Sequence, residues 1–200
     1  MRKQREWYPG AIYHLMERGI RRMEIFQDDL DYETFLVILK RLAEKHAITV
    51  HAYCLMTNHV HLLLETSDQE IGGFMQRLAG DYARTYNRRY GYRGHLFENR
   101  YKGCLVRDDS YFLQTSRYIH LNPVKAGMVQ NAEDYPWSSY RCILGLRDDG
   151  LTERNKTLVY FKGRSVALYR QFVEDGGSKY EAAENTIRRS MGEDALWLPW

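Results

Sequence analysis

Two histidines separated by one aliphatic residue could bind a metal ion. His59 and His61 flank Val60 in the segment HVHLLLE. In an extended strand, residues i and i+2 point to the same face, with Cα atoms about 6.6 Å apart. Two imidazoles on one face can converge on a single cation. The spacing is short and common, however, so on its own it favours two ordinary packed or exposed histidines.

A tyrosine and an asparagine one helical turn apart form the second candidate pair. Tyr118 and Asn122 lie four residues apart in RYIHLNP, so an unbroken helix would place them on one face. A phenol with a pKa of about 10 is a nucleophile once it is activated. An amide oxygen beside two imidazoles makes a mixed site that suits Mg²⁺ or Mn²⁺.

Pro123 leaves a second interpretation of this pair open. Asn122 is a good N-cap, and Pro123 fits the first position of a new helix. Proline also biases the preceding residue away from the helical region. Under this interpretation Asn122 only caps a helix and Tyr118 only packs.

A basic stretch runs from residue 77 to residue 102, with seven basic and two acidic residues. Its net charge of +5 exceeds the +3 of the whole chain, and tyrosines are interleaved with the cations. Phosphates attract cations and unpaired bases stack on aromatic rings, so the pattern suits single-stranded nucleic acid. Composition alone favours a more ordinary interpretation, in which the cations form a solvated helix face and the aromatic residues belong to the core. The proposed DNA contacts are Arg84, Arg88, Arg89, Arg93, Arg100 and Lys102.

The elements around these residues follow a recognisable order. Periodicity predicts strands at 11–17, 48–56, 59–65 and 101–107, and helices at 28–46, 69–90 and 110–121, with Asn122 and Pro123 interrupting the last helix. The first six elements form a split βαβ pattern, so we expect an α+β, ferredoxin-like sandwich. Its four-stranded antiparallel sheet carries both helices on one face and leaves the other face available.

Composition bounds the class of protein. The 200 residues are 44% hydrophobic, which is enough for a core. The longest apolar run, Phe35 to Leu39, is far shorter than the roughly 20 residues of a membrane helix. Three scattered cysteines without a CxxC pair fit a reducing compartment, so we expect a cytoplasmic protein. We expect a main domain over residues 1–145 and a more polar accessory helical segment over 146–200.

Five segments together give a family resemblance. They are YPGAIYHLMERG, AYCLMTNHVHLLLE, GHLFENRYKG, RYIHLNPVKAGMV and DYPWSSY. In this order and spacing they resemble REP-associated tyrosine transposases, which belong to the single-tyrosine HUH transposases of bacterial insertion sequences; REP stands for repetitive extragenic palindrome. The resemblance covers residues 8 to 145.

The resemblance implies a ferredoxin-like enzyme that cleaves and rejoins single-stranded, hairpin-forming DNA. It implies that His59 and His61 bind a divalent metal, Mg²⁺ or Mn²⁺, and that Tyr118 is the nucleophile that forms a 5′-phosphotyrosine. Asn122 matches the position that often completes the metal site. The resemblance further implies a monomer rather than a homodimer. We expect this monomer to be associated with the chromosome and not with a membrane.

Two features depart from the family pattern, and two other functions stay open. Glu98 stands where many relatives have Gln, and the chain after residue 145, which ends in LWLPW, matches nothing assignable. The first alternative is a domesticated, non-catalytic DNA-binding protein, although His59, His61 and Tyr118 are all intact. The second is an RNA-binding module, which would need exposed aromatic residues on its central strands.

Overall fold

A four-stranded antiparallel sheet forms the centre of the molecule. The computed structural model describes residues 6–175 and 181–191. The strands are β1 (Ile12–Arg18), β2 (Thr49–Met56), β3 (His59–Glu65) and β4 (Lys102–Val106), in the spatial order β2-β3-β1-β4. Every neighbouring pair is antiparallel. This order is that of the ferredoxin-like pattern, so the predicted fold is confirmed.

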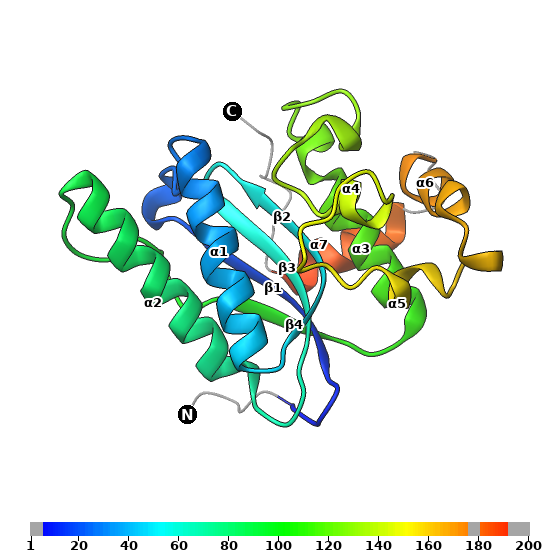
Figure 1. Ribbon diagram of the computed structural model, residues 1–200, viewed down its shortest axis with the longest axis horizontal. Coiled ribbons are helices and arrows are strands. Elements are labelled where there is room, and N and C mark those ends of the chain that lie inside the picture. The colour runs from blue at the N-terminus through cyan, green and yellow to red at the C-terminus, as the bar shows by residue number, and fades with distance from the viewer. Residues whose placement is uncertain (1–5, 176–180, 192–200) are drawn as a thin grey trace.

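Two long helices cover one face of the sheet (Figure 1). They are α1 (Asp29–Lys45) and α2 (Ile71–Tyr90). The Asp28 carboxylate accepts a hydrogen bond from the Asp31 amide and caps α1. Gly91 ends α2 in the left-handed conformation, with a φ of 68°. Both helices match the periodicity of their apolar residues, because those residues form the main core with alternate residues of the strands.

The third helix, α3 (Asp109–Lys125), packs on the opposite face of the sheet. It continues through Pro123, so the predicted interruption at Asn122 and Pro123 is wrong, and Asn122 is not an N-cap. Proline removes only the hydrogen bond to the carbonyl of Ile119. The next turn is intact, because the amide of Ala126 still donates to the carbonyl of Asn122 at 2.9 Å. The buried Pro123 ring adds to the packing of the helix.

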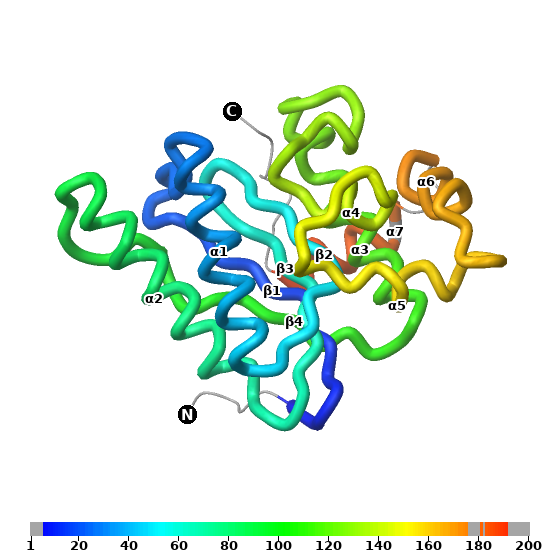
Figure 2. Tube along the Cα trace, in the orientation of Figure 1, coloured from blue at the N-terminus to red at the C-terminus, as the bar shows by residue number. Residues whose placement is uncertain are grey.

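The rest of the chain wraps around α3. It contains α4 (Tyr140–Ile143), α5 (Asn155–Leu158), α6 (Val166–Glu174), α7 (Glu181–Ser190) and the 3-10 turns Ala132–Asp134 and Lys162–Arg164. A further 3-10 turn, Ile20–Arg22, lies between β1 and α1. Figure 2 shows that the chain runs away from α3 through α5 and then comes back to α3. Both α6 and α7 contact α3. The described part of the predicted accessory segment is therefore helical and packed on the core, while a domain boundary at residue 145 stays a prediction.

No helix within the described residues is long and apolar enough to cross a membrane. The segment LWLPW, which departs from the family pattern, lies outside the described residues.

Candidate active site

His59 and His61 lie side by side on the face of β3 that α3 covers. Their ring centroids are 4.9 Å apart, and the ring planes are nearly perpendicular at 86°. Val60, between them, points to the opposite face and joins the main core. The strand alternation therefore places both imidazoles where the sequence pattern predicted.

Burial keeps both imidazoles neutral. His59 is 5% exposed and His61 is fully buried. Removal from water lowers the pKa of His61 to about 3, and the nearby positive charge of Arg18 acts in the same direction. Burial, His61 and Arg18 also hold the pKa of His59 well below its usual range. A neutral imidazole is the form that binds a metal ion.

Each of the two rings is oriented by a hydrogen bond at its own Nδ1. The Nδ1 of His59 lies 2.7 Å from the side-chain oxygen of Asn58. The Nδ1 of His61 lies 3.1 Å from the Nε2 of His14. His59 Nδ1 donates to the Asn58 oxygen, which leaves its Nε2 as the nitrogen that would bind a metal. In His61, Nε2 is the metal-binding nitrogen in the tautomer whose Nδ1 donates to His14.

His14 is a site residue that the sequence analysis missed. It lies on β1, where Met16 is the direct partner of His61 and His14 is its diagonal neighbour on the same face. The predicted fold already pairs β1 with β3, but the position of His14 beside His61 also depends on the register of the two strands, which the sequence does not give. The hydrophobic alternation around His14 does not reveal which residues of the neighbouring strand lie beside it.

Tyr118 on α3 stands over this histidine cluster. Its ring centroid is 5.7 Å from that of His61 and 5.9 Å from that of His14. The Lys125 ammonium lies 5.5 Å from the same ring. Tyr118 is 2% exposed. The helix therefore brings the predicted nucleophile and the predicted metal ligands into one cluster.

Tyr111, two turns earlier on α3, points elsewhere. Its hydroxyl lies 3.1 Å from the Ser190 hydroxyl and 3.5 Å from the Cys104 thiol. Burial raises the pKa of Tyr111 to about 12. Of the two tyrosines, Tyr118 is the one that contacts the histidines.

Asn122 lies one turn after Tyr118, with its amide turned toward its own helix. The amide nitrogen donates to the carbonyl oxygen of Tyr118 at 2.8 Å, which leaves Oδ1 as the atom that would bind a cation. Across the described ranges, no three His, Cys, Asp or Glu side chains form a metal-binding group. Two imidazoles and one amide oxygen are a donor mixture suited to a borderline or hard divalent ion, and a cation shared by His59, His61 and Asn122 stays a prediction.

The structure divides the predicted DNA contacts into two groups. Arg84 forms an ion pair with Asp81, and Arg89 bridges Asp28 and Asp31. Arg88, Arg93 and Arg100 are exposed and form no ion pair with any described residue. Lys102 is exposed at the start of β4.

The tyrosines of the basic stretch are divided in the same way. Tyr82 and Tyr86 are core residues, and Tyr90 donates to Asp31 at 2.8 Å. Tyr92 is 51% exposed, which leaves it as the stacking candidate among these four residues.

Comparisons with known proteins identify the family. Residues 8–122 match the family described as "Transposase IS200 like". A Haemophilus influenzae protein named provisionally as a REP-associated tyrosine transposase is 27% identical over 148 residues, which cover 68% of this chain and 84% of that protein. A solved structure of a REP-associated tyrosine transposase bound to a REP hairpin superposes with a TM-score of 0.61 at 16% identity, over 77% of this chain and 90% of that one. The matched family region contains the histidine cluster, Tyr118 and Asn122, and the chain belongs to the IS200-like transposase family.

Proposed function

We propose that this protein is a metal-dependent, single-tyrosine transposase that cleaves and rejoins single-stranded, hairpin-forming DNA. The observation that carries the proposal is the position of the Tyr118 ring, 5.7 Å from the ring of His61, whose neighbour is His59. Membership of the transposase family and the hairpin bound to the structural relative support DNA as the substrate.

In the proposed reaction, the Tyr118 hydroxyl attacks a DNA phosphorus atom in line with the bond to the 3′ oxygen. The phenol gives up its proton as the new O–P bond forms. The P–O3′ bond breaks, and the 3′ oxygen leaves as a hydroxyl after it takes up a proton. The products are a 5′-phosphotyrosine and a free 3′ end.

A bound Mg²⁺ or Mn²⁺ would supply Lewis-acid stabilisation to the non-bridging phosphate oxygens. His59 and His61 would hold it through Nε2, and Asn122 would hold it through Oδ1. His14 fixes the orientation of the His61 ring through its hydrogen bond. The rings of His61 and Tyr118 lie 5.7 Å apart without DNA, and both are buried, so DNA binding would have to expose them.

The covalent intermediate suits strand transfer. The phenolate is a better leaving group than an alkoxide, so a 3′ hydroxyl of the same or another strand can displace Tyr118 and restore a phosphodiester. The exposed side chains of Arg88, Arg93 and Arg100 would contact the DNA backbone. We infer that one chain is sufficient, because the histidines, Tyr118 and Asn122 all come from the same protomer.

The test uses a labelled pool of DNA hairpins with randomised single-stranded flanks. Incubation with Mg²⁺ or Mn²⁺ should yield a shorter labelled strand and a protein–DNA adduct that survives denaturing electrophoresis. A chelator should abolish both products. Hairpin binding without any adduct in the presence of metal would instead support the non-catalytic DNA-binding alternative.

A further inference from the structure

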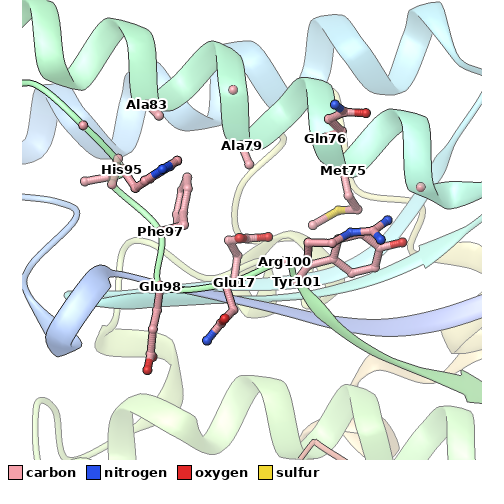
Figure 3. Close-up of a pocket in the computed structure, with 15 residues that line it drawn as sticks. Glu17, Met75, Gln76, Ala79, Ala83, His95, Phe97, Glu98, Arg100 and Tyr101 are labelled. Carbon is pink, nitrogen blue, oxygen red and sulfur yellow. The ribbon is translucent and has the colours of Figure 1, made fainter. Parts of the chain in front are cut away.

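Arg18 lies on the same face of the sheet as the two histidines of β3. It is the last residue of β1, and its direct partner on β3 is His59. Figure 3 shows the preceding side chain, Glu17, pointing toward α2 on the opposite face. Because successive side chains of a strand alternate between the two faces, Arg18 points to the α3 side, where His59 and His61 lie.

The Arg18 side chain folds back along β1 toward the histidines. Its terminal nitrogen Nη2 lies 3.9 Å from the Sδ atom of Met16, and Met16 is the strand partner of His61. Burial is the main cause of the lowered pKa of both His59 and His61, but the positive charge of Arg18 also contributes to each. Arg18 itself is partly buried. The guanidinium is therefore held beside the histidine cluster.

The proposed nucleophile faces the same cluster from α3. The Tyr118 ring lies 5.7 Å from the ring of His61. Residues directly opposite each other on antiparallel strands have Cβ atoms about 5 Å apart, so Arg18 begins close to His59. A phosphate that Tyr118 attacks beside the two histidines would therefore come within reach of the Arg18 guanidinium.

The chemistry of an arginine suits this position. The second cation near the Tyr118 ring is Lys125, whose ammonium is paired with Glu184 of α7. A guanidinium presents a rigid fork of N–H groups that matches the oxygens of a phosphate, which a lysine ammonium does not. In phosphoryl transfer, negative charge lies on the non-bridging oxygens of the transition state, and a fixed positive charge beside them stabilises it.

We propose that Arg18 is a further catalytic residue, whose guanidinium binds a non-bridging oxygen of the phosphodiester that Tyr118 attacks. The inference rests on the proposed function, because that function supplies the DNA phosphate. A guanidinium stays protonated in proteins, so Arg18 donates hydrogen bonds and neither gives nor takes up a proton. The bonds that form and break are those already given for the Tyr118 reaction.

The experiment removes each partner of this contact in turn. Once the adduct assay has located the cleaved bond, one labelled strand carries the natural phosphodiester at that position. Two further strands carry the separated isomers of a methylphosphonate, in which a methyl group replaces one or the other non-bridging oxygen and removes the negative charge. Binding of the three strands is measured in chelator, so that the readout does not depend on metal or on cleavage. Arg18→Met keeps an apolar side chain of similar length without the charge.

The wild-type protein should bind the natural strand roughly fivefold or more tightly than at least one methylphosphonate isomer, because a charge-assisted hydrogen bond is lost. Arg18→Met should reduce this preference to less than about twofold, since the contact is already absent. With Mg²⁺ or Mn²⁺, Arg18→Met should form the adduct about 100-fold more slowly than the wild type.

Arg107→Met is the matched control. Arg107 follows β4 at the opposite end of β1 from Arg18, because Val106 pairs with Ile12. It is exposed and forms an ion pair with Glu6. This variant should keep both the wild-type preference for the natural strand and the wild-type rate of adduct formation.

Two results would overturn the inference. The first is a wild-type protein that binds the natural strand and both isomers equally. The second is a folded Arg18→Met that keeps the wild-type preference or the wild-type rate. Circular dichroism and thermal melting establish whether the variant folds, and Arg18→Gln, with the same expected losses, replaces Arg18→Met if it does not.

The adduct assay separates this inference from the proposed function. If the wild-type protein forms the adduct and Arg18→Met forms it equally fast, the assignment of Arg18 alone is wrong. If the wild-type protein forms no adduct in the presence of metal, the proposed function is wrong, and the role of Arg18 is rejected with it.

Discussion

At the residue scale, burial determines the chemistry of the histidine cluster. His14 and His61 are fully enclosed, and their mutual repulsion as cations adds to the cost of removal from water, which holds the pKa of His14 well below its usual range. The cluster is therefore neutral under ordinary conditions. Neutral rings can bind a cation without first losing protons, which distinguishes this site from an exposed HxH pair.

The first prediction concerns His61. His61→Gln should reduce the rate of metal-dependent DNA cleavage at least 100-fold, because it removes the ring nitrogen proposed to bind the metal. The choice of Gln over Ala follows from burial, since truncation of a fully buried side chain would also create a cavity. Gel-based cleavage kinetics would measure the loss. His46→Gln, a change outside the cluster, should cleave like the wild type, and equal activity of the two variants would contradict the assignment.

The second prediction concerns the pH dependence of stability. The folded-state pKa of Glu17, about 8, lies above its ordinary value of 4.5. Its contribution to the free energy of unfolding is therefore greatest below pH 4.5 and is lost as the pH rises to about 8. At about 1.4 kcal/mol per pKa unit, the loss is roughly 5 kcal/mol. Urea unfolding at several pH values should show wild type losing stability relative to Glu17→Gln over this window; a constant difference would contradict the shift.

Sequence patterns located some of these residues and not others. His59, His61 and Tyr118 belong to motifs that are continuous in sequence, so the resemblance of those motifs to a family could single them out, although the local spacing alone favoured ordinary packed side chains. His14 and Glu17 acquire their surroundings from the register of β1 against β3 and from the helix that covers each face. Such surroundings depend on contacts between residues about 45 positions apart, which no local spacing records.

At the element scale, periodicity predicted all four strands and the first two helices, because each buries one continuous face. The end of α3 could not be predicted in this way. Local preference at Asn122 and Pro123 favours a break, but the buried ring of Pro123 and the intact hydrogen bond between Asn122 and Ala126 keep the helix continuous. Tertiary packing decided this turn, and the continuous turn is what keeps Asn122 on the helix beside Tyr118.

The third prediction compares two neighbouring arginines of α2. Arg88 is exposed without an ion pair among the described residues, whereas Arg89 bridges Asp28, which caps α1, and Asp31 within α1. Arg88→Gln should reduce the salt dependence of single-stranded DNA binding by about 0.7 in the log–log slope. Arg89→Gln should leave that slope unchanged and lower the melting temperature. Fluorescence titrations at four salt concentrations and thermal melts would decide, and the reverse pattern would reject this division of the basic stretch.

At the scale of the whole molecule, α3 lies between the sheet and the C-terminal helices. Tyr169 of α6 is fully buried, and its hydroxyl lies 2.8 Å from both the Ser116 hydroxyl and the Nδ1 of His120. Arg117 donates to Glu184 of α7 at 2.9 Å. The low hydrophobicity of this segment suggested an accessory role, because composition does not show that a few buried side chains complete a core.

The fourth prediction follows from this packing. A fragment of residues 1–145 should lose more than about 3 kcal/mol of stability or aggregate, because Tyr140 and Ile143 would lose their contacts with Leu158, Tyr169 and Val173. Thermal unfolding and size-exclusion chromatography of the fragment and the full chain would measure the effect. An equally stable, monodisperse fragment would show instead that residues 1–145 form an independent domain.

The central claim is that Tyr118 becomes covalently attached to DNA, and mass spectrometry of the DNA-linked peptide tests it most directly. Wild-type protein incubated with hairpin DNA and Mg²⁺ or Mn²⁺ should give one modified peptide, with the phosphodiester on Tyr118. Tyr118→Phe keeps the ring, so it should fold and bind DNA but form no adduct. A modification on Tyr111, or an adduct that persists in Tyr118→Phe, would contradict the account.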